Sequence, residues 1–565
     1  MQLMIRSFKG SSVGGSASAT RLPNAIITAL LILIIGSGLL QVVLTYSVFS
    51  NTVDEPAHLA AGLEWLDRGS YEMEALHPPL ARVAIAIGPY LAGARLAAED
   101  IWSAGTGVLC TGVNYVQKLT LARIGVLPFF TMASVLVWVL TRGQFGDVAA
   151  IVATLLFNTL PPVLGHAAVA TTDMPATATF LLAFWLFRRW LRYRTLQSCV
   201  LMSVGIAAAL LTKYSNLVFL AATLPVVALF PRLRHDNTIE HQPKLAREMT
   251  ASVVIIAVVI IGAYRFSVAP VLRPQFKSAK QFNALVGKTG RFHNLAYKIG
   301  STPIPAPEFV RGVWSLYHKE GKSELSFVLN RYYEGAPWFF FVVALAVKTP
   351  IPCLLAAIAG LIVLTARYPR VGAATHFAAV PVLLLLVSSA SSVKLGVRHI
   401  LPIYPFIAIL GGVAASCAWH QREWQYVWRT AVVLLVVSQI YCVVASAPDY
   451  LSYFNVLAGR EPAEVLVESD LDWGQDLFRL SDRLRQLNVH HVSVAYFGPS
   501  ECIPAVGLPD YTILRGNERV TGWVAVSESL KVYARGSYEW LRRYQPVAKA
   551  GKSIRIYYIP SSPAS

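Results

Sequence analysis

The sequence has few charged residues for its length, and their signs are unbalanced. Only 14% of the 565 residues are Asp, Glu, Lys or Arg, whereas 55% are hydrophobic, and the mean hydropathy is +0.51. Acidic residues are scarcer than basic ones, with 31 against 49, so the formal net charge is +18. This composition excludes an ordinary soluble protein. It predicts a polytopic α-helical membrane protein.

Cysteine pairs with the spacing of metal ligands or redox motifs are also missing. The chain has no C-x-x-C sequence, so neither a zinc site nor a redox motif is indicated. We expect most of the cysteines to be small apolar packing residues. The six are Cys110, Cys199, Cys353, Cys417, Cys442 and Cys502.

The basic residues do not form one long patch of the kind that binds nucleic acid. They gather in short clusters beside apolar runs, at Arg188–Arg194, Arg232–His235 and Arg367–Arg370. Loops on the cytoplasmic side of a membrane carry such an excess of Lys and Arg. We therefore expect membrane lipids and no nucleic acid as partners, and we place these clusters in the cytoplasm.

The apolar runs predict about eleven membrane spans, because a helix needs about 20 residues to cross a bilayer. Residues 1–21 are expected as a cytoplasmic tail, and the run from Leu22 to Phe49 is longer than a signal-peptide core. The run Leu80 to Ala98 is interrupted by charges and proline, so it is expected to lie along the outer interface. The other spans are expected near 119–140, 147–165, 174–191, 196–212, 215–231, 249–268, 338–366, 372–391, 399–418 and 430–447.

This threading divides the chain into a multi-span domain, residues 22–447, and an external C-terminal part, residues 448–565. The multi-span domain has two long external loops, residues 50–118 and 269–337. Prolines 350 and 352 break the run 338–366, so a helix before Lys348 and a crossing after Pro350 are expected, with Lys348 near the outer surface. The N-terminus is then cytoplasmic and the C-terminus external.

The C-terminal part changes character and predicts a small soluble α/β domain. Ser469–Asp476 opens an amphipathic stretch that runs to Arg485, and strand-like runs lie at 492–497, 520–527 and 554–559. Asp470, Asp472 and Asp476 lie at the start of this stretch. They fit a capped helix start better than a metal site, because their spacing matches no EF-hand.

The predicted topology brings acids and bases to the outer face of the membrane. A carboxylate can remove a proton from a hydroxyl while cations stabilise a departing phosphate, and these two tasks complement each other. Charges at a membrane edge are costly unless they serve a function. The residues on this side are Asp54, Glu55, His58, His77, Arg82, Asp173, Lys213, Arg331, Lys348, Lys394, Arg398, His399 and Asp470–Asp476.

Several sequence words in this inventory resemble the membrane-embedded GT-C glycosyltransferases, which include the bacterial aminoarabinose transferases and the protein O-mannosyltransferases. The similarity extends over roughly residues 20–450. The words are Asp54-Glu55, His77-Pro-Pro-Leu80 with Arg82, Thr172-Asp173, Arg331 to Lys348-Thr-Pro350, and Val397-Arg398-His399 to Pro405.

The resemblance implies an inverting transferase. Such enzymes take a sugar from a polyprenyl-phosphate donor and pass it to an acceptor on the external face, and the acceptor can be a lipid, a polysaccharide or a protein. The external loop 269–337 is too short for the β-trefoil module of eukaryotic protein mannosyltransferases. A bacterial enzyme of the inner membrane is therefore expected.

The resemblance also implies roles for single residues. Asp54 is expected as the general base, and Glu55 as a second catalytic-site acid that orients the acceptor or holds the loop. The donor phosphate is expected to bind Arg82, Lys348 and Arg398, whose charge-assisted contacts suit it. The residues expected near the acceptor or behind the first contacts are His58, His77, Asp173 and His399, the last in place of an aromatic residue found in many relatives.

No metal ligands are assigned, and the residues imply no cofactor. Dependence on a divalent metal stays open, because the family contains both kinds of enzyme. Three alternatives also stay open. A transporter or lipid flippase would be polytopic too, although its polar residues tend to lie near the midplane. A surface-polysaccharide ligase would share the lipid-linked substrates. The third alternative is that single residues have no chemical role. Asp54 can be a plain loop charge, Arg82 can contact lipid headgroups, and Asp173 can cap the following helix.

Overall fold

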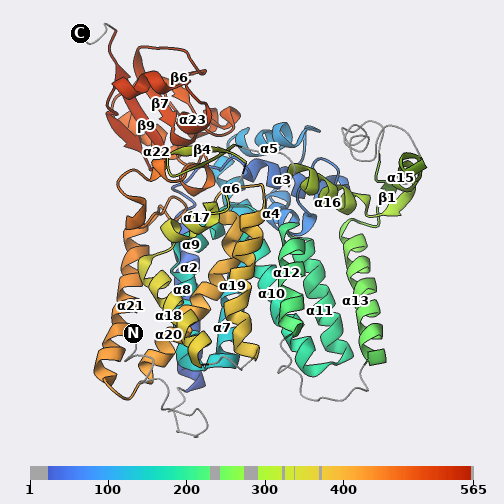
Figure 1. Ribbon diagram of the computed structural model, residues 1–565. Helices are drawn as coiled ribbons and strands as arrows, with labels where there is room; N and C mark the ends of the chain where they lie inside the picture. Colours follow the sequence, from blue (N-terminus) through green and yellow to red (C-terminus); the bar gives the residue numbers. More distant parts are fainter. Residues whose placement is uncertain are drawn as a thin grey trace.

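The computed structural model describes residues 23–229, 242–272, 291–320, 325–335, 337–367 and 372–561. The predicted cytoplasmic tail lies outside these residues. The described chain forms a bundle of long apolar helices with a five-stranded sheet at one end (Figure 1). Helices α3, α4, α5 and α16 lie at that same end of the bundle, to the side of the sheet (Figure 1). The chain is therefore a helical protein of membrane type.

The first part of the chain is helical. Its elements are α2 (Asn24–Leu44), α3 (Glu55–Leu63), α4 (Pro79–Leu91), α5 (Ile101–Cys110), α6 (Tyr115–Ile124), α7 (Leu127–Phe145), α8 (Asp147–Asn158), α9 (Pro161–Ala167), α10 (Asp173–Tyr193), α11 (Leu196–Leu210), α12 (Ser215–Leu229) and α13 (Gln242–Ala263), with a π-helical turn η2 (Glu64–Arg68) after α3.

Two short pairs of strands lie in the part of the chain that follows α13. Strands β1 (Val268–Pro270) and β2 (Pro303–Pro305) pair antiparallel, as do β3 (Leu325–Val328) and β4 (Arg331–Glu334). The helices of this part are α15 (Arg291–Ser301), α16 (Pro307–Glu320), α17 (Phe340–Lys348), α18 (Ile351–Arg367), α19 (Gly372–Ala390), η5 (Val397–Ile403), α20 (Tyr404–Trp419) and α21 (Gln425–Ser446).

Five described helices are long and apolar enough to cross a membrane, or up to seven if each bent pair counts as one span. Several shorter apolar helices coincide with further predicted spans, so the count of eleven stays a prediction. Helices α17 and α18 meet at an angle of 116°. The expected break between Lys348 and Pro350 is thus confirmed.

Helix α20 continues from η5, and together they form the most buried of the five membrane-length spans, Val397–Trp419. Glycines allow its neighbours to approach closely. A Cβ added at Gly360 of α18 would lie 1.9 Å from the Leu410 carbonyl oxygen, and one at Gly412 would lie 2.3 Å from that of Ala149 in α8. Small residues at such crossings are how apolar helices pack in a membrane, where burial from water adds nothing.

Helix α10 separates the two kinds of charge that the sequence predicts on opposite sides. Asp173 is its first residue, and the cluster Arg188–Arg194 occupies its last turns. A helix of 21 residues is about 30 Å long, which is the thickness of a bilayer core. The acid and the basic cluster therefore lie at opposite ends of a membrane-length helix.

The C-terminal sheet has the strand order β6-β5-β7-β9-β8. Strand β5 pairs parallel with β6 and β7, and β9 pairs antiparallel with β7 and β8. The sequence predicts three of these strands and the amphipathic helix, and misses the short β6 and β8. The elements are α22 (Leu477–Gln486), β5 (His491–Ala495), β6 (Asp510–Ile513), β7 (Gly522–Ser527), α23 (Glu528–Tyr533), β8 (Ala548–Ala550) and β9 (Ile554–Ile559), with short 3-10 turns η6 (Val456–Ala458), η7 (Pro462–Glu464), η8 (Glu468–Asp470), η9 (Ser500–Cys502), η10 (Pro504–Val506) and η11 (Glu539–Arg543).

The sheet is joined to the first long loop by a disulfide. Cys110, the last residue of α5, is bonded to Cys502 across a sequence separation of 392. The expectation of isolated packing residues is wrong for this pair, because no local spacing signals a bond between residues so far apart. Leu59 and Leu109 from the loop share one apolar core with Leu480 and Val492.

Replacing Cys110 by Ser should loosen this junction. We expect a loss of about 2–4 kcal/mol of stability, since a disulfide mainly constrains the unfolded chain. The measurement is the unfolding temperature of the purified protein, with Cys442→Ser, a half-buried cysteine of α21 outside the disulfide, as control. A Cys110→Ser protein as stable as the wild type would contradict a bond at this position.

Candidate active site

The loop that carries Asp54 is held by the segment after the last apolar helix. The Ser50 amide donates to the Gln475 carbonyl at 3.0 Å, and the Val53 amide donates to the Trp473 carbonyl at 2.9 Å. The loop ends where Asp54 precedes α3, with Pro56 in the first turn of the helix. Proline is favoured there because its missing amide would have no partner.

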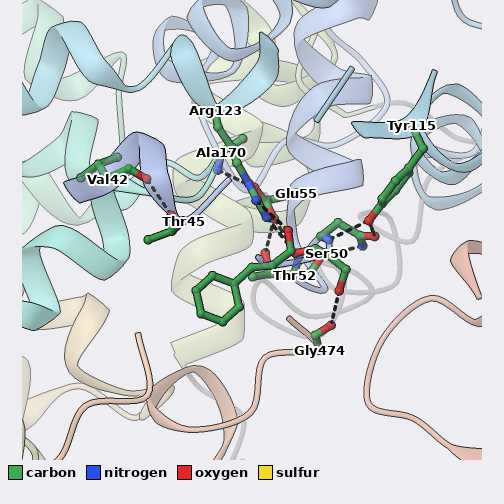
Figure 2. A network of polar contacts seen from close by, with 11 residues as sticks. Val42, Thr45, Ser50, Thr52, Glu55, Tyr115, Arg123, Ala170 and Gly474 are labelled. Carbon is green, nitrogen blue, oxygen red and sulfur yellow. Dashed lines mark hydrogen bonds and ion pairs between the residues drawn. The ribbon is translucent and has the colours of Figure 1, made fainter. Parts of the chain in front are cut away.

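The carboxylate of Glu55 is held by a buried network of hydrogen bonds (Figure 2). Arg123 of α6 donates to both of its oxygens, through Nε to Oε1 at 2.8 Å and through Nη2 to Oε2 at 3.0 Å. The amides of Ala170 and Thr52 add bonds of 2.7 Å each. Both charged side chains are only 1% exposed. This geometry fits the loop-holding role for Glu55, the second of the two roles that the sequence allows.

Asp54 points away from that network and meets Arg398 at the start of η5. Arg398 Nη1 donates to Asp54 Oδ2 at 2.8 Å, and Nη2 lies 3.5 Å from Glu468 Oε1. The guanidinium carbon lies 4.4 Å from the centre of the Trp473 ring, a cation–π distance. Asp54 is 27% exposed while Arg398 is 9% exposed. The carboxylate is therefore open to a ligand on a side that the arginine does not cover.

Arg82, predicted to bind phosphate, is turned inward instead. It is 2% exposed and forms an ion pair with Glu74. Its Nη1 donates to the Tyr71 hydroxyl at 3.2 Å, and its Nε donates to His58 Nδ1 at 3.1 Å. Each of the three guanidinium nitrogens therefore donates to one of these partners. Arg82 contributes charge and position to the site, with no exposed donor.

The two predicted histidines lie side by side. The rings of His58 and His77 are 5.1 Å apart and perpendicular. Burial lowers the pKa of His58 to about 3, helped by the Arg82 guanidinium and opposed by the Asp54 and Asp173 carboxylates. Burial also holds the pKa of His77 well below its usual range. Both rings are neutral at pH 7, and the Arg82 bond to Nδ1 puts the proton of His58 on Nε2.

Asp173 pairs with the second cation of this region. Lys213 Nζ lies 2.5 Å from Asp173 Oδ1, and the Thr171 hydroxyl donates to Oδ2 at 3.2 Å. Thr172, next to Asp173, lies 3.5 Å from His77 Nδ1 through its hydroxyl. The structure thus brings Asp54, Asp173 and the two histidines to one region.

Lys348 and His399 have partners of their own away from Asp54. Lys348 is fully buried and donates to the carbonyls of Leu451 at 2.8 Å and of Asp470 at 2.5 Å. These bonds attach the chain after α21 to the end of α17. His399 lies over Phe341, with ring centres 6.3 Å apart. Lys348 therefore holds the backbone in place, and its ammonium group is too buried to contact a phosphate.

The aspartates before α22 neither cap it nor gather around a metal. Asp476 precedes the helix without a side-chain cap bond, and its carboxylate instead accepts from Ser553. Asp472 accepts from the amides of Ser529 and Gly474. The predicted cap is wrong for this reason. In the part of the chain that the structure describes, no three His, Cys, Asp or Glu residues are grouped as metal ligands.

Sequence reasoning missed five residues of the site. Arg123 and Glu74 are the partners of predicted residues, while Glu468 and Trp473 reach the site from the C-terminal part. His166 is buried, with its ring 6.1 Å from that of Trp473 and no partner for Nδ1. The available signal was the Glu468–Asp476 stretch, where six polar residues follow directly on an apolar run. Trp473 lies within the Asp470–Asp476 part of it, which the sequence places on the outer face without a role.

Comparisons with known proteins agree with this picture. The family model described as dolichyl-phosphate-mannose-protein mannosyltransferase matches residues 115–261, about a quarter of the chain. This segment carries Arg123, His166, Asp173 and Lys213. The match confirms the resemblance to the lipid-phosphate-dependent membrane glycosyltransferases within it. No curated protein sequence matches the chain.

Solved structures of two proteins resemble the chain in outline. ArnT from Cupriavidus metallidurans bound to undecaprenyl phosphate is 13% identical, with 95% of this chain and 99% of that one covered and a TM-score of 0.47; its apo form has 13% identity, 94% and 98% coverage and a TM-score of 0.49. The oligosaccharyltransferase AglB from Archaeoglobus fulgidus, with an inhibitory peptide and a dolichol-phosphate, is 12% identical, with 95% and 75% covered and a TM-score of 0.48. All three TM-scores are below 0.5.

Replacing Glu55 by Ala should destabilise the protein, because Arg123 would stay buried without its partner. We expect a loss of about 3–5 kcal/mol. The matched control is Asp147→Ala, which breaks the Arg142–Asp147 pair, 2.7 Å long and 42% and 23% exposed, and should cost at most about 1 kcal/mol. Thermal unfolding of the purified variants measures both; equal shifts would contradict the anchoring role of Glu55.

Proposed function

We propose, from the premise that the chain is a membrane glycosyltransferase of the GT-C type, that it transfers a sugar from a polyprenyl-phosphate donor, with inversion, to an acceptor on the external face of the membrane. The observation that carries this proposal is the contact between Asp54 and Arg398. It places a partly exposed carboxylate and a cation 2.8 Å apart. A single-displacement transfer needs a base for the acceptor and a positive charge for the phosphate, and this pair supplies both.

In the proposed reaction Asp54 takes the proton of the acceptor hydroxyl as its oxygen attacks the anomeric carbon. The bond from that carbon to the phosphate oxygen breaks, and its electron pair leaves with the polyprenyl phosphate. Arg398 stabilises the charge that the leaving phosphate gains, through donors that are pre-oriented on Trp473. The acceptor oxygen attacks the anomeric carbon from the side opposite the departing phosphate, so the donor phosphate must first replace Asp54 at Arg398 Nη1.

The other predicted residues take supporting roles in this proposal. Glu55 holds the loop through Arg123, and Arg82 and Lys348 hold α4 and the C-terminal segment through their internal partners. Asp173 and the neutral His58 and His77 form the wall beside Asp54. The phosphate contact, expected from three cations, is concentrated on Arg398.

We further propose that the site faces the outside of a bacterial inner membrane. Two observations support this side. The Arg188–Arg194 cluster is at the far end of α10 from Asp173, as expected for a cytoplasmic cluster. The Cys110–Cys502 disulfide joins elements at the end of the bundle where the site lies, and disulfides persist in oxidising compartments such as the periplasm.

Replacing Asp54 by Asn should abolish transfer. Because a positioned base contributes about 10²- to 10⁴-fold, we expect at least about a hundredfold loss at unchanged protein level. Membranes are supplied with radiolabelled polyprenyl-phosphate sugars, and label in the acceptor fraction is counted. The matched control is Asp67→Asn, an acid of the same loop that is 24% exposed and 3.4 Å from Arg95.

Each outcome of this test is informative. Label in the acceptor with the wild type and the control, and none with Asp54→Asn, supports the proposal and identifies the sugar. Equal transfer by Asp54→Asn removes Asp54 as the base. Absence of transfer by the wild type from every donor would favour the transporter or flippase instead.

A further inference from the structure

The segment Val467–Gln475 has no role that the sequence assigns, although Asp472–Asp476 within it and just beyond it resembles a stretch of many bacterial relatives, and it closes one side of the site. Trp473 lies under Arg398, and the carbonyls of Trp473 and Gln475 hold the Asp54 loop. Glu468 reaches the same guanidinium from the other arm. A part of the chain more than 400 residues away in sequence therefore sets the surroundings of Asp54.

The contact between Asp54 and Arg398 poses a difficulty for catalysis. At 2.8 Å the two charges satisfy each other, so the carboxylate is a poorer proton acceptor and the guanidinium is less available to a phosphate. The donor phosphate must take over Nη1 for both groups to act. If Arg398 had Asp54 as its sole anionic partner, leaving Asp54 would leave the side chain held only by Trp473 and by the bond from Nε to the Leu395 carbonyl at 3.4 Å, so its two Nη groups could follow the phosphate.

Glu468 is built to prevent this. Its side chain is 14% exposed, with Oε1 3.5 Å from Arg398 Nη2 and Oε2 accepting from the Ser469 amide at 2.7 Å. Its own amide donates to the Ser529 hydroxyl at 3.0 Å. Its φ of 51° is in the left-handed region, which costs a residue with a side chain about 1–3 kcal/mol. The surrounding bonds keep Glu468 in this costly conformation, facing the arginine.

We propose that Glu468 is a positioning residue of the transferase site: it holds Arg398 over Trp473 through Nη2 while the donor phosphate replaces Asp54 at Nη1. The inference rests on the proposed function. No bond to Glu468 forms or breaks in the reaction, and it does not touch the sugar or the phosphate. Its charge also offsets that of Arg398 before the donor arrives, so the arginine is paired on both arms in the free enzyme.

The test is Glu468→Gln, which keeps the size of the side chain and removes its charge. Nη2 of Arg398 then loses its anionic partner, and the arginine follows the donor phosphate away from its place over Trp473, so kcat should fall about tenfold. The donor KM should be unchanged or lower, because Arg398 has lost a competing anion. Glu468→Asp keeps the charge and should recover part of kcat. A purely structural role would reduce the amount of folded protein without separating kcat from KM.

The matched control is Glu539→Gln, an acid of the same C-terminal part that is 63% exposed and 3.8 Å from Arg542. Initial rates are measured at varied donor concentration with equal amounts of protein that elutes as a single species. An unchanged kcat, or a raised donor KM, in Glu468→Gln overturns the inference.

The result also separates the two proposals. If the wild type transfers sugar, Asp54→Asn does not, and Glu468→Gln behaves like the control, the proposed function stands and the role of Glu468 is overturned. If the wild type transfers no sugar, both proposals are overturned.

Discussion

The buried ion pair between Glu55 and Arg123 is the contact on which the arrangement of the site depends. Asp54 and Glu55 are adjacent in the sequence, but their side chains pair with different arginines. Glu55 is fixed by Arg123 and by two backbone amides in the interior, which leaves Asp54 at the start of α3 directed toward Arg398. Removing one charge of such a pair leaves the other without a partner in a place that water does not reach. One acid thus positions the loop so that its neighbour is available for chemistry.

The C-terminal part is integrated with the helix bundle by polar contacts as well as by the disulfide. Lys348 holds the carbonyls of Leu451 and Asp470, and the Asp54 loop is bonded to Trp473 and Gln475. The site is therefore made by segments from both ends of the chain. This explains why an acidic, tryptophan-containing stretch lies between the last apolar helix and α22, where a plain linker would suffice to connect two independent domains.

The sequence predicts the class of the fold and the segments that form the site, but it does not predict which residues pair with each site residue. Apolar run length and charge placement predict most of the helices, and the break at Lys348 follows from two prolines. Asp54 and Arg398 are predicted and do meet. Arg82 and Lys348 show the limit, because no local pattern reveals that Glu74 and the carbonyl of Asp470 would occupy them. Pairings such as Glu55–Arg123 and Cys110–Cys502 depend on tertiary structure, which a single sequence does not display.

The central claim is that Asp54 masks Arg398 until a phosphate displaces it. The most direct test is the affinity of the purified protein for a polyprenyl phosphate, the leaving group without its sugar, in the wild type, Asp54→Asn and Arg398→Gln. The account predicts that Asp54→Asn binds it at least as tightly as the wild type, since the arginine is released. It predicts that Arg398→Gln binds about tenfold or more weakly, because a bond to a charged group is worth about 1.5–3 kcal/mol. Loss of binding in Asp54→Asn, or full binding by Arg398→Gln, would contradict it.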